Sequence, residues 1–471
     1  MPSAKFGMIG LGTMGRNFML NVAEQGFSSV GYDLNAEKLS LLLDEGRGLD
    51  ISAARSIREF LAALERPRNI MLLVPAGPVV DSVIGELTPL LEPGDLIIDG
   101  GNSHFPDTAR RETFLNEQGF EFLGVGVSGG EEGARHGASI MAGGRAEIYE
   151  RVRPILEAAS AKVEGEPCAA HVGTGAAGHY VKMVHNGIEY GLMQLIAEAY
   201  DLLKRGYHMP NGEMAELFAE WNRGELNSFL IEITSQILRK EDPKTGEPLV
   251  EMILDKAGQK GTGRWTSQHA MDLGIPIPTI DAAVSMRQLS ALKPERKAAA
   301  EKLQISGELD ETEDLRESTI EFVRDGLHLA FITAYAQGFT MLRAASTELA
   351  FELDMVEIAK IWRGGCIIRA ALLEDIRRAY RRDPALPNLL VADEFMPAIK
   401  RKHASLKAFV HFAVSADIPC MCAAASLNYL KAYASERLPA NMLQAQRDYF
   451  GAHTYERIDE AGTFHTPDWD K

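Results

Sequence analysis

The feature that most constrains the fold is a glycine motif near the N-terminus. Gly10, Gly12 and Gly15 stand in GLGTMG, directly after the apolar run Lys5–Ile9 and at the start of an amphipathic stretch. Glycines at this spacing permit a tight turn, close approach of the backbone to a pyrophosphate and close packing of helix on strand. The order of strand, motif, helix and second strand therefore predicts a dinucleotide-binding α/β domain.

An acidic residue, Asp33, ends the second expected strand. A carboxylate about 20 residues beyond the glycine motif accepts hydrogen bonds from the ribose hydroxyls of NAD, and its charge repels the 2′-phosphate of NADP. Aspartate is also a common helix cap, so the alternative is that Asp33 only caps the helix that follows.

Short apolar runs alternate with amphipathic stretches in the first part of the chain, which predicts a parallel sheet covered by helices. The expected strands are Lys5–Ile9, Ser29–Tyr32, Asn69–Val74, Asp95–Ile98 and Glu121–Val127. The expected helices are Met14–Ala23, Ala36–Leu43, Ser56–Leu64 and Val79–Leu91. Ser56 and Glu59 form a capping box at the start of one of them.

After Gly173 the strand-like runs stop, and apolar residues recur at helical spacing to about residue 435. Tyr180–Leu203 is long enough to be a central helix, and the polar ending AGTFHTPDWDK is typical of a tail. A chain of 471 residues also exceeds what one core supports. We expect a Rossmann-like α/β domain over residues 1–177, a large all-α domain over 178–435 and a C-terminal tail over 436–471.

The net charge of the chain disfavours some classes of binding partner. Its formal net charge of −17 disfavours nucleic acid and anionic membranes. No apolar stretch approaches the ~20 residues of a membrane helix and the N-terminus lacks a signal pattern, so we expect a cytoplasmic protein. The four cysteines and twelve histidines have no metal-ligand spacing, so we expect buried free thiols and no metal.

Polar side chains follow two of the expected strands. DGGNS contains Asn102 and GVSGGEEGARHG contains Ser128, Gly129 and Gly130. The carboxyl ends of strands in an open α/β sheet form the ligand crevice, so both segments would face the nicotinamide end of a dinucleotide. The alternative is that both are ordinary tight turns.

A further segment, HYVKMVHNGIEYG, opens the expected central helix. Lys182, His185, Asn186 and Glu189 stand at i, i+3, i+4 and i+7, which places them on one stripe of that helix. Such a stripe is usually a solvated face, but the surrounding residues are apolar, so we expect this one to line a cleft. Burial would lower the pKa of a lysine and raise that of a glutamate, which suits two proton-transfer groups.

Seven segments together carry a resemblance to a known family. In chain order they are GLGTMGRNFMLN, DGGNS, GVSGGEEGARHG, KMVHNGIEY, QKGTGRWT, WRGGCIIR and RDYFGAHTYER. The chain resembles the 6-phosphogluconate dehydrogenase family over nearly its full length. The resemblance implies oxidative decarboxylation of 6-phospho-D-gluconate to D-ribulose 5-phosphate and CO2 with reduction of NAD(P)+, in the pentose phosphate pathway and gluconate utilization.

The resemblance also implies residue roles. Lys182 accepts the proton of the carbon-3 hydroxyl and Glu189 protonates carbon 1 of the enediol, with no metal required. The expected substrate-binding residues are Asn102, Ser128, Gly129, Gly130, His185, Asn186, Tyr190, Lys260, Thr262, Arg287, Arg447 and His453. The expected cofactor-binding residues are Gly10, Leu11, Gly12, Thr13, Met14, Gly15, Asp33, Leu34, Asn35, Lys38, Val74, Pro75, Ala76 and Asn102. The family forms homodimers in which the C-terminal segment, here with Arg447 and His453, reaches the partner's site.

The cofactor positions depart from the family pattern. Many members carry asparagine, arginine and threonine where this chain has Asp33, Leu34 and Asn35, and the arginine binds the 2′-phosphate of NADP. Pro75 also replaces a usual lysine, although Lys38 remains as a nearby cation. We therefore expect NAD to be preferred over NADP.

Two other functions are compatible with parts of the sequence. One is a related β-hydroxyacid dehydrogenase acting on a small unphosphorylated acid, which would not need Lys260, Thr262, Arg287 and Arg447 together. The other is a dinucleotide-binding protein without catalysis, which the presence of Lys182 and Glu189 disfavours.

Overall fold

The computed structural model describes residues 3–305 and 313–469. Contacts between residues divide the chain into two compact units, Met1–Ser426 and Leu427–Lys471. The first unit contains the sheet and most of the helices, and the second contains the C-terminal segment. This α/β fold followed by a largely helical region confirms the expected fold class, whereas the expected domain boundaries stay predictions.

One large sheet organises the beginning of the first unit. Its strands are β1 (Phe6–Ile9), β2 (Ser29–Tyr32), β3 (Ile51–Ala54), β4 (Asn69–Leu72), β5 (Leu96–Asp99), β6 (Glu121–Ser128), β7 (Ser139–Gly144) and β10 (Ala169–Gly173). They lie in the order β10-β7-β6-β5-β4-β1-β2-β3. All neighbours pair parallel except β6 and β7, which pair antiparallel. A separate two-stranded hairpin comprises β8 (Lys162–Val163) and β9 (Glu166–Pro167).

Helices connect and cover these strands. They are α1 (Thr13–Glu24), α2 (Ala36–Glu45), α3 (Ile57–Ala62), α4 (Pro78–Leu87), the 3-10 turn η1 (Thr88–Leu90), α5 (Phe105–Asn116), α6 (Gly130–His136) and α7 (Ala146–Ala159). The Ser56 cap is confirmed because its hydroxyl accepts a hydrogen bond from the Glu59 amide at 3.2 Å. The Glu59 carboxylate accepts from the Arg55 amide at 2.8 Å, one residue before the cap.

Alternate strand residues face opposite sides of the sheet, and each side has its own apolar core. Phe6 and Met8 pack on one side with Phe18 of α1. Ile9 packs on the other side with Phe60 of α3. Burial on both faces is what a parallel sheet covered by helices requires.

The five expected strands are confirmed within a few residues, but β3, β7 and β10 were not expected. β7 has the sequence SIMAGG and β10 has AAHVG, which are rich in small residues with weak strand preference. Pairing with the edge of an existing sheet, rather than local sequence, therefore decides their conformation.

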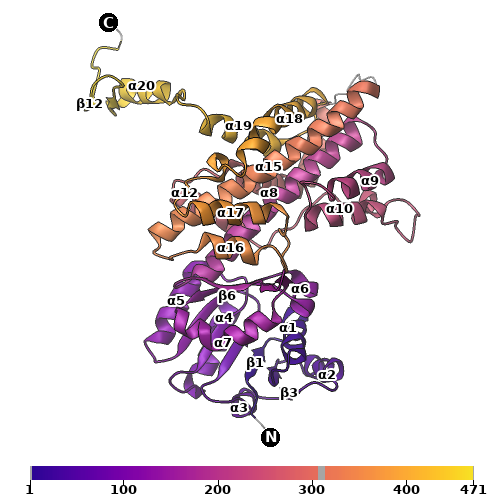
Figure 1. Cartoon of the computed structure of the whole chain (residues 1–471), viewed down its shortest axis with the longest axis vertical. Helices are drawn as coiled ribbons and strands as arrows, with labels where there is room; N and C mark the ends of the chain where they lie inside the picture. Colours follow the sequence, from indigo (N-terminus) through magenta and orange to yellow (C-terminus); the bar gives the residue numbers. More distant parts are fainter. Residues whose placement is uncertain (1–2, 306–312, 470–471) are drawn as a thin grey trace. The chain divides into compact units, whose positions relative to one another are not determined.

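The rest of the first unit is helical, as Figure 1 shows from magenta to orange. The expected central helix is confirmed as α8 (Ala177–Asp201), which continues into a π-helical turn, η2 (Leu202–Gly206). The other elements are α9 (Asn211–Trp221), α10 (Phe229–Arg239), α11 (Leu249–Met252), α12 (Thr262–Asp272), α13 (Pro278–Ala291), α14 (Lys293–Leu303), α15 (Glu313–Glu348), α16 (Met355–Ile361), α17 (Leu372–Arg382), η3 (Leu389–Val391) and α18 (Met396–Ser415). α8 packs against α12, α13 and α15, which buries most of its surface.

The second unit begins within α19 (Met421–Tyr433) and continues through α20 (Ala440–Gly451). A short antiparallel pair follows, β11 (Tyr455–Glu456) with β12 (Thr463–Phe464). The sequence predicted helical spacing only to about residue 435 and a tail after it, and two-residue strands carry too little pattern to be recognised there.

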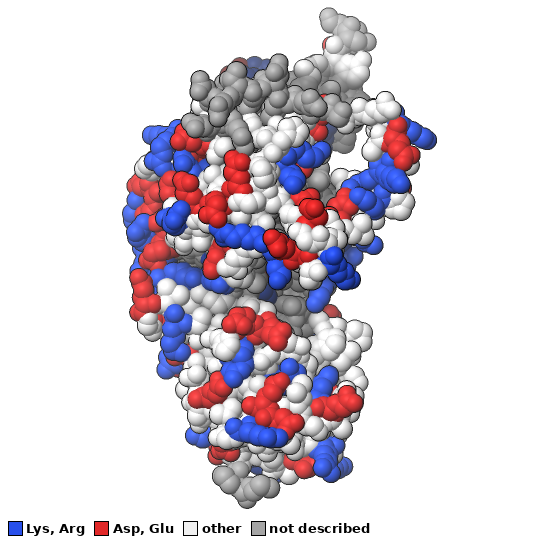
Figure 2. All heavy atoms as spheres, turned by 90° about the vertical axis from the view of Figure 1, so that its right-hand side faces the viewer, with Lys and Arg blue, Asp and Glu red and all other residues white. Residues whose placement is uncertain are grey.

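Several general expectations can be compared with the described residues. All four cysteines are buried free thiols, as predicted. Among the residues that the structure describes, no helix has the length and apolarity needed to cross a membrane. On the face shown in Figure 2, basic and acidic side chains are interspersed, with no broad area of one charge.

Candidate active site

A cavity of about 1450 Å³ in the first unit brings most of the predicted site residues together. Its volume exceeds the roughly 300–1,000 Å³ of ordinary ligand pockets, so it has room for a dinucleotide together with a small substrate. The predicted residues that line it are Gly10, Gly12, Thr13, Met14, Gly15, Asp33, Leu34, Lys38, Val74, Pro75, Ala76, Asn102, Lys182, Asn186, Glu189, Tyr190, Lys260, Thr262 and Arg287.

The glycine loop has the geometry of a pyrophosphate cradle. A Cβ on Gly15 would lie 1.9 Å from the carbonyl oxygen of Gly10, so only glycine allows α1 to start this close to β1. A Cβ on Gly12 would meet nothing within 4 Å, so its absence leaves open space above the loop. α1 has no side-chain cap and no acidic residue in its first turn. The positive end of its dipole is therefore free for an anion, and the loop fits a dinucleotide.

Asp33 links the end of β2 to this loop. Its carboxylate accepts hydrogen bonds from the backbone amides of Leu11 at 2.8 Å and Asn35 at 2.9 Å, and it pairs with Lys38 at 3.1 Å. Desolvation raises the pKa of Asp33, but these hydrogen bonds outweigh it and hold the pKa below its ordinary value. Asn35, not Asp33, caps α2 by accepting from the Glu37 amide, so the capping alternative for Asp33 is wrong.

The charge around Asp33 is mainly negative. Glu86 also lines the cavity, and desolvation together with Glu86 and Asp33 raises the pKa of Tyr32. The cation at this end, Lys38, is already paired with Asp33, while Leu34 is 89% exposed. This end of the cavity therefore offers hydrogen-bond acceptors rather than a phosphate site.

Two predicted cofactor residues do not line the cavity. The Leu11 side chain is fully buried in the core, and its backbone amide is already bonded to Asp33. The Asn35 side chain is used as the cap of α2. Both predictions followed from position in a motif. In the structure the Leu11 amide bonds to Asp33 and the Asn35 side chain caps α2, so both residues stabilise the loop conformation.

Lys182, Asn186 and Glu189 of the polar stripe on α8 line the cavity, in agreement with the expectation that this stripe faces a cleft. Lys182 is only 6% exposed, and a Cβ on Gly126 of β6 would lie 2.4 Å from the Lys182 Cβ, so this glycine makes room for the lysine. Burial lowers the pKa of Lys182, opposed by the negative charge of Glu189. Burial raises the pKa of Glu189, opposed by Lys182 and Arg287. Both pKa values thus move toward neutrality, where proton transfer is efficient.

His185 and Ser128 lie behind the cavity wall. The His185 ring is fully buried, with Nε2 at 3.2 Å from the Ser128 hydroxyl and Nδ1 at 3.0 Å from the Asn186 side-chain oxygen. Desolvation and then Lys182 lower the pKa of His185 well below its ordinary value, so the ring is neutral near pH 7. In that state Nδ1–H donates to Asn186 and Nε2 accepts from Ser128. The Asn186 amide nitrogen is left to donate into the cavity.

Gly129 and Gly130 also do not line the cavity. Gly129 precedes α6 with a φ of +118°, and a Cβ there would lie 2.5 Å from the Gly365 carbonyl oxygen. WRGGCIIR, which contains Gly365, therefore lies directly against the loop after β6. Gly129 is required by this close approach whether or not its amide contacts a substrate.

The other end of the cavity carries cations and hydroxyl groups. The Arg287 guanidinium lies 3.4 Å above the Tyr190 ring and donates to the Gly258 carbonyl at 3.1 Å. A Cβ on Gly263 would lie 2.5 Å from the same ring, so this glycine lets α12 approach α8. Among the side chains that the structure describes, no carboxylate lies at ion-pair distance from Lys260, which lines the cavity. This group of side chains can bind an anion.

Sequence reasoning missed His104 and Trp265, whose rings stack at 4.5 Å with an interplanar angle of 24°. Both line the cavity. His104 caps α5 directly after DGGNS, and Trp265 belongs to QKGTGRWT, so their adjacency to two motifs was the available signal. The stack joins the sheet part of the unit to α12.

Arg447 and His453 lie in the second unit, at α20 and just after it. Both side chains are exposed. Arg447 donates weakly to the side chain of Gln444 at 3.4 Å, and the His453 ring lies 5.9 Å from that of Phe450.

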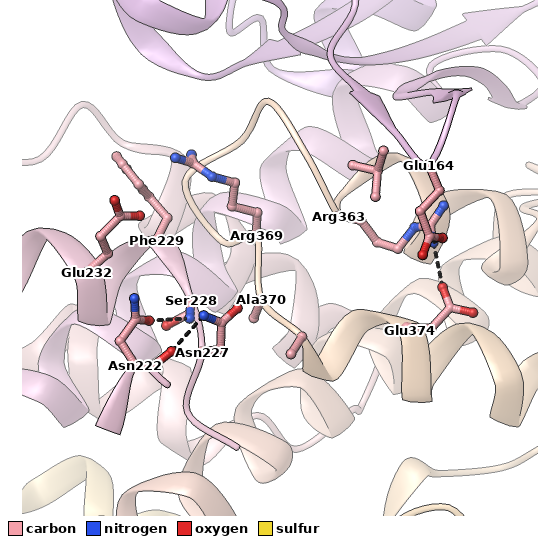
Figure 3. A pocket seen from close by; sticks show the side chains of 12 residues that line it. Glu164, Asn222, Asn227, Ser228, Phe229, Glu232, Arg363, Arg369, Ala370 and Glu374 are labelled. Atoms are coloured by element: carbon pink, nitrogen blue, oxygen red, sulfur yellow. Dashed lines mark hydrogen bonds and ion pairs between the residues drawn. The ribbon is translucent and has the colours of Figure 1, made fainter. Parts of the chain in front are cut away.

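A second, smaller cavity of about 310 Å³ contains none of the predicted site residues. Figure 3 shows its wall, where several polar groups bond to one another. The Arg363 guanidinium pairs with Glu374 at 2.7 Å, and the Ser228 amide donates to Asn222 at 2.9 Å. Such pairing is typical of a hollow between packed elements. Across the described part of the chain, no group of three or more His, Cys, Asp or Glu side chains is placed to hold a metal ion.

Comparison with known proteins covers the whole chain. The NAD binding domain of 6-phosphogluconate dehydrogenase matches residues 5–173, and the C-terminal domain of 6-phosphogluconate dehydrogenase matches residues 178–469. The chain is 50% identical over 472 residues to an NADP(+)-dependent, decarboxylating 6-phosphogluconate dehydrogenase of Bacillus subtilis, covering 100% of both chains. It is 51% identical to the decarboxylating enzyme of Synechococcus elongatus, covering 99% of each.

A solved structure gives the same result. The 6-phosphogluconate dehydrogenase of Plasmodium falciparum, described in its apo form and with NADP+ or 6-phosphogluconate, has a TM-score of 0.96 and 43% identity. The similarity covers 98% of this chain and 100% of that chain. With matching sequence families over both halves and matching structure over nearly every residue, the chain belongs to the 6-phosphogluconate dehydrogenase family.

Proposed function

We propose that this chain oxidises and decarboxylates 6-phospho-D-gluconate to D-ribulose 5-phosphate and CO2, with NAD(P)+ reduced, in the pentose phosphate pathway and gluconate utilization. The observation that carries the proposal is that buried Lys182 and partly buried Glu189 line one cavity with the glycine loop and with Tyr190, Lys260, Thr262 and Arg287. Family membership supports the same reaction.

Lys182 and Glu189 divide the proton transfers. A nicotinamide dinucleotide held by the glycine loop and Asp33 would supply the hydride acceptor for carbon 3. Neutral Lys182 accepts the proton of the carbon-3 hydroxyl, which leaves a 3-keto acid that readily loses CO2. Protonated Lys182 then donates to the enolate oxygen, and protonated Glu189 donates to carbon 1 of the enediol. The pKa directions of both groups favour the forms that these steps require.

The remaining predicted residues orient the substrate. Asn102 and Asn186 line the cavity, and the bond from His185 orients the Asn186 amide nitrogen toward the sugar acid. The phosphate lies with the other group of residues, which comprises Tyr190, Lys260, Thr262 and Arg287. Ser128, Gly129, Gly130 and His185 shape the wall behind the sugar.

NAD is the preferred cofactor in this proposal. Asp33 and Glu86 put negative charge where NADP would carry its 2′-phosphate, and Lys38 is neutralised by Asp33. Leu34 supplies no cation. The Bacillus relative is named NADP(+)-dependent and the Plasmodium structure was described with NADP+, so this preference rests on the residues of this chain alone.

The C-terminal unit is proposed to complete the site of a partner subunit in a homodimer. Arg447 and His453 are exposed, and α20 also exposes large apolar side chains. These are Met442 at 60%, Leu443 at 63%, Tyr449 at 64% and Phe450 at 71%. Burial of this apolar surface against a second copy would stabilise the dimer.

Initial rates of absorbance at 340 nm with 6-phosphogluconate, measured with NAD and with NADP while CO2 is trapped, test the proposal. We expect reduction of NAD with one CO2 released per NADH, and no reduction with unphosphorylated gluconate at the same concentration. At least tenfold better use of NADP would contradict the cofactor preference. Reduction without CO2 would contradict the reaction.

A further inference from the structure

The C-terminal unit is organised around one buried carboxylate. Asp448 of α20 is only 1% exposed, although the residues beside it on the helix are exposed. Its Oδ1 accepts from the Thr454 amide at 2.9 Å and lies 2.9 Å from His465 Nδ1. Its Oδ2 accepts from the Thr466 amide at 2.9 Å and from Trp469 Nε1 at 3.0 Å. These four contacts fill the acceptor capacity of a carboxylate.

The contacts of Asp448 hold a chain reversal that local sequence does not favour. Ala452 and Thr454 have positive φ angles of +49° and +61°, a region that residues with a Cβ rarely adopt. Gln444 donates to the Thr454 carbonyl at 2.6 Å, and the pairing of β11 with β12 brings the last residues back toward α20. The reversal therefore depends on bonds made from α20, of which Asp448 accepts the largest share.

This arrangement fixes the backbone on either side of two proposed substrate residues. Arg447 immediately precedes Asp448, and His453 immediately precedes Thr454, whose amide Asp448 holds. A Cβ on Gly451 would lie 2.7 Å from the His453 ring, so that ring is seated over the end of α20. Asp448 thus holds the backbone that carries Arg447 and His453, although its carboxylate contacts neither side chain.

We propose that Asp448 is a positioning residue that presents Arg447 and His453 as one preorganised anion-binding pair. The inference rests on the proposed function, in which these two side chains complete the partner's phosphate site. A tail with a fixed reversal binds the substrate without first ordering the chain, whereas a disordered tail loses that ordering free energy from each binding event. Desolvation raises the pKa of Asp448, but its hydrogen bonds hold the pKa below the ordinary value, so the anchor stays ionised.

The kinetic test compares two substitutions with a matched control. Asp448→Ala removes all four acceptor contacts, and Asp448→Asn keeps the shape but replaces an acceptor oxygen with a donor. Asp459→Asn is the control, because Asp459 lies in the same unit and pairs with Arg457 at 2.8 Å on the surface. We expect Asp448→Ala to raise KM for 6-phosphogluconate at least tenfold, Asp448→Asn to raise it less, and the control to change it less than twofold.

The KM for NAD distinguishes a loss of substrate positioning from general damage to the protein. KM for NAD should be unchanged in all three variants, because the tail is assigned to the substrate end. Hydrogen exchange should show that the amides of Thr454 and Thr466 lose protection in Asp448→Ala. An unchanged KM for 6-phosphogluconate in Asp448→Ala, or equal rises for substrate and cofactor, would overturn the inference.

Mixed dimers distinguish this inference from the dimer proposal. Subunits with Lys182→Met, which are inactive but have a native tail, are refolded together with Asp448→Ala subunits. Each heterodimer then holds one site with native Lys182 and a native tail from the partner, so wild-type KM should reappear. Heterodimers that form without this recovery would overturn the positioning role in the partner's site.

The last measurement is the oligomeric state of the wild-type protein. If it is a monomer by light scattering, the homodimer proposal fails on its own. A raised KM in Asp448→Ala would then place the positioning role within one chain, and an unchanged KM would overturn both.

Discussion

The two ends of the large cavity are built in different ways. The dinucleotide end is built mainly around one loop, in which Gly12 leaves space above the backbone amides, while Asp33 and Glu86 add negative charge beside it. The substrate end assembles Lys182 of α8, Lys260 and Arg287 from distant parts of the chain. Its proton-transfer groups, buried Lys182 and partly buried Glu189, have pKa values shifted by desolvation. The first end binds through the shape of a loop, and the second acquires reactivity from burial.

The largest difference between the two ends is expected when the buried lysine is replaced, because catalysis should be lost while dinucleotide binding is kept. Lys182→Met keeps the length of the side chain but removes the base, and general-base catalysis is typically worth about 10²–10⁴ in rate. We expect kcat to fall on the order of 10³-fold while the Kd for NAD, measured by fluorescence titration, changes less than twofold. Hydride transfer that persists in a single turnover would remove Lys182 as the base.

The carboxylate of the pair, Glu189, should affect a later step than Lys182 does. Glu189→Gln should lower kcat on the order of 10²-fold with little change in KM, because its proton is donated after decarboxylation. Deuterium incorporation at carbon 1 of ribulose 5-phosphate in D2O should slow, while release of CO2 in the first turnover persists. Glu220→Gln on the exposed face of α9 is the control and should behave as wild type. A rise in KM alone would make Glu189 a substrate-binding group.

The contrast between the two ends also explains what the sequence could predict. GLGTMG, β1, β2 and Asp33 are contiguous, so their arrangement follows from local geometry and was predicted correctly. The stripe on α8 was predictable because helical periodicity alone brings Lys182 and Glu189 to one face. The direction of both pKa shifts followed from the apolar residues around them.

Other features depend on contacts that no local pattern records. β7 and β10 become strands because the sheet edge is available, and the His104–Trp265 stack joins residues far apart in the sequence. Leu11 was expected at the cofactor because of its place in the motif, but whether a side chain faces a ligand or the core is decided by packing. Asp448 anchors the tail through four donors from the end of the chain, and no local sequence pattern predicts these contacts.

Substitutions at the dinucleotide end should shift the preference from NAD toward NADP without changing the reaction that is catalysed. Asp33→Asn with Leu34→Arg removes a repulsive charge and adds a cation, and a charge-assisted hydrogen bond contributes roughly 1.5–3 kcal/mol. The ratio of kcat/KM for NADP to that for NAD should therefore rise about 10- to 100-fold by the same estimate. Leu43→Arg adds the same charge on α2 outside the cavity and should leave the ratio unchanged. An unchanged ratio in the double variant would assign cofactor choice to other residues.

The smallest effect is expected where the sheet part and the helical part of the first unit meet. His104 stacks on Trp265, and α12, which carries Trp265, begins at Thr262 beside Lys260. Loss of an aromatic pair typically costs about 0.5–1.5 kcal/mol, so His104→Leu should raise KM for 6-phosphogluconate roughly 2- to 10-fold. Because the stack is one contact, the double variant with Trp265→Leu should be no worse than the poorer single variant. Additive losses would mean that each ring acts separately and that the stack does not couple the two parts.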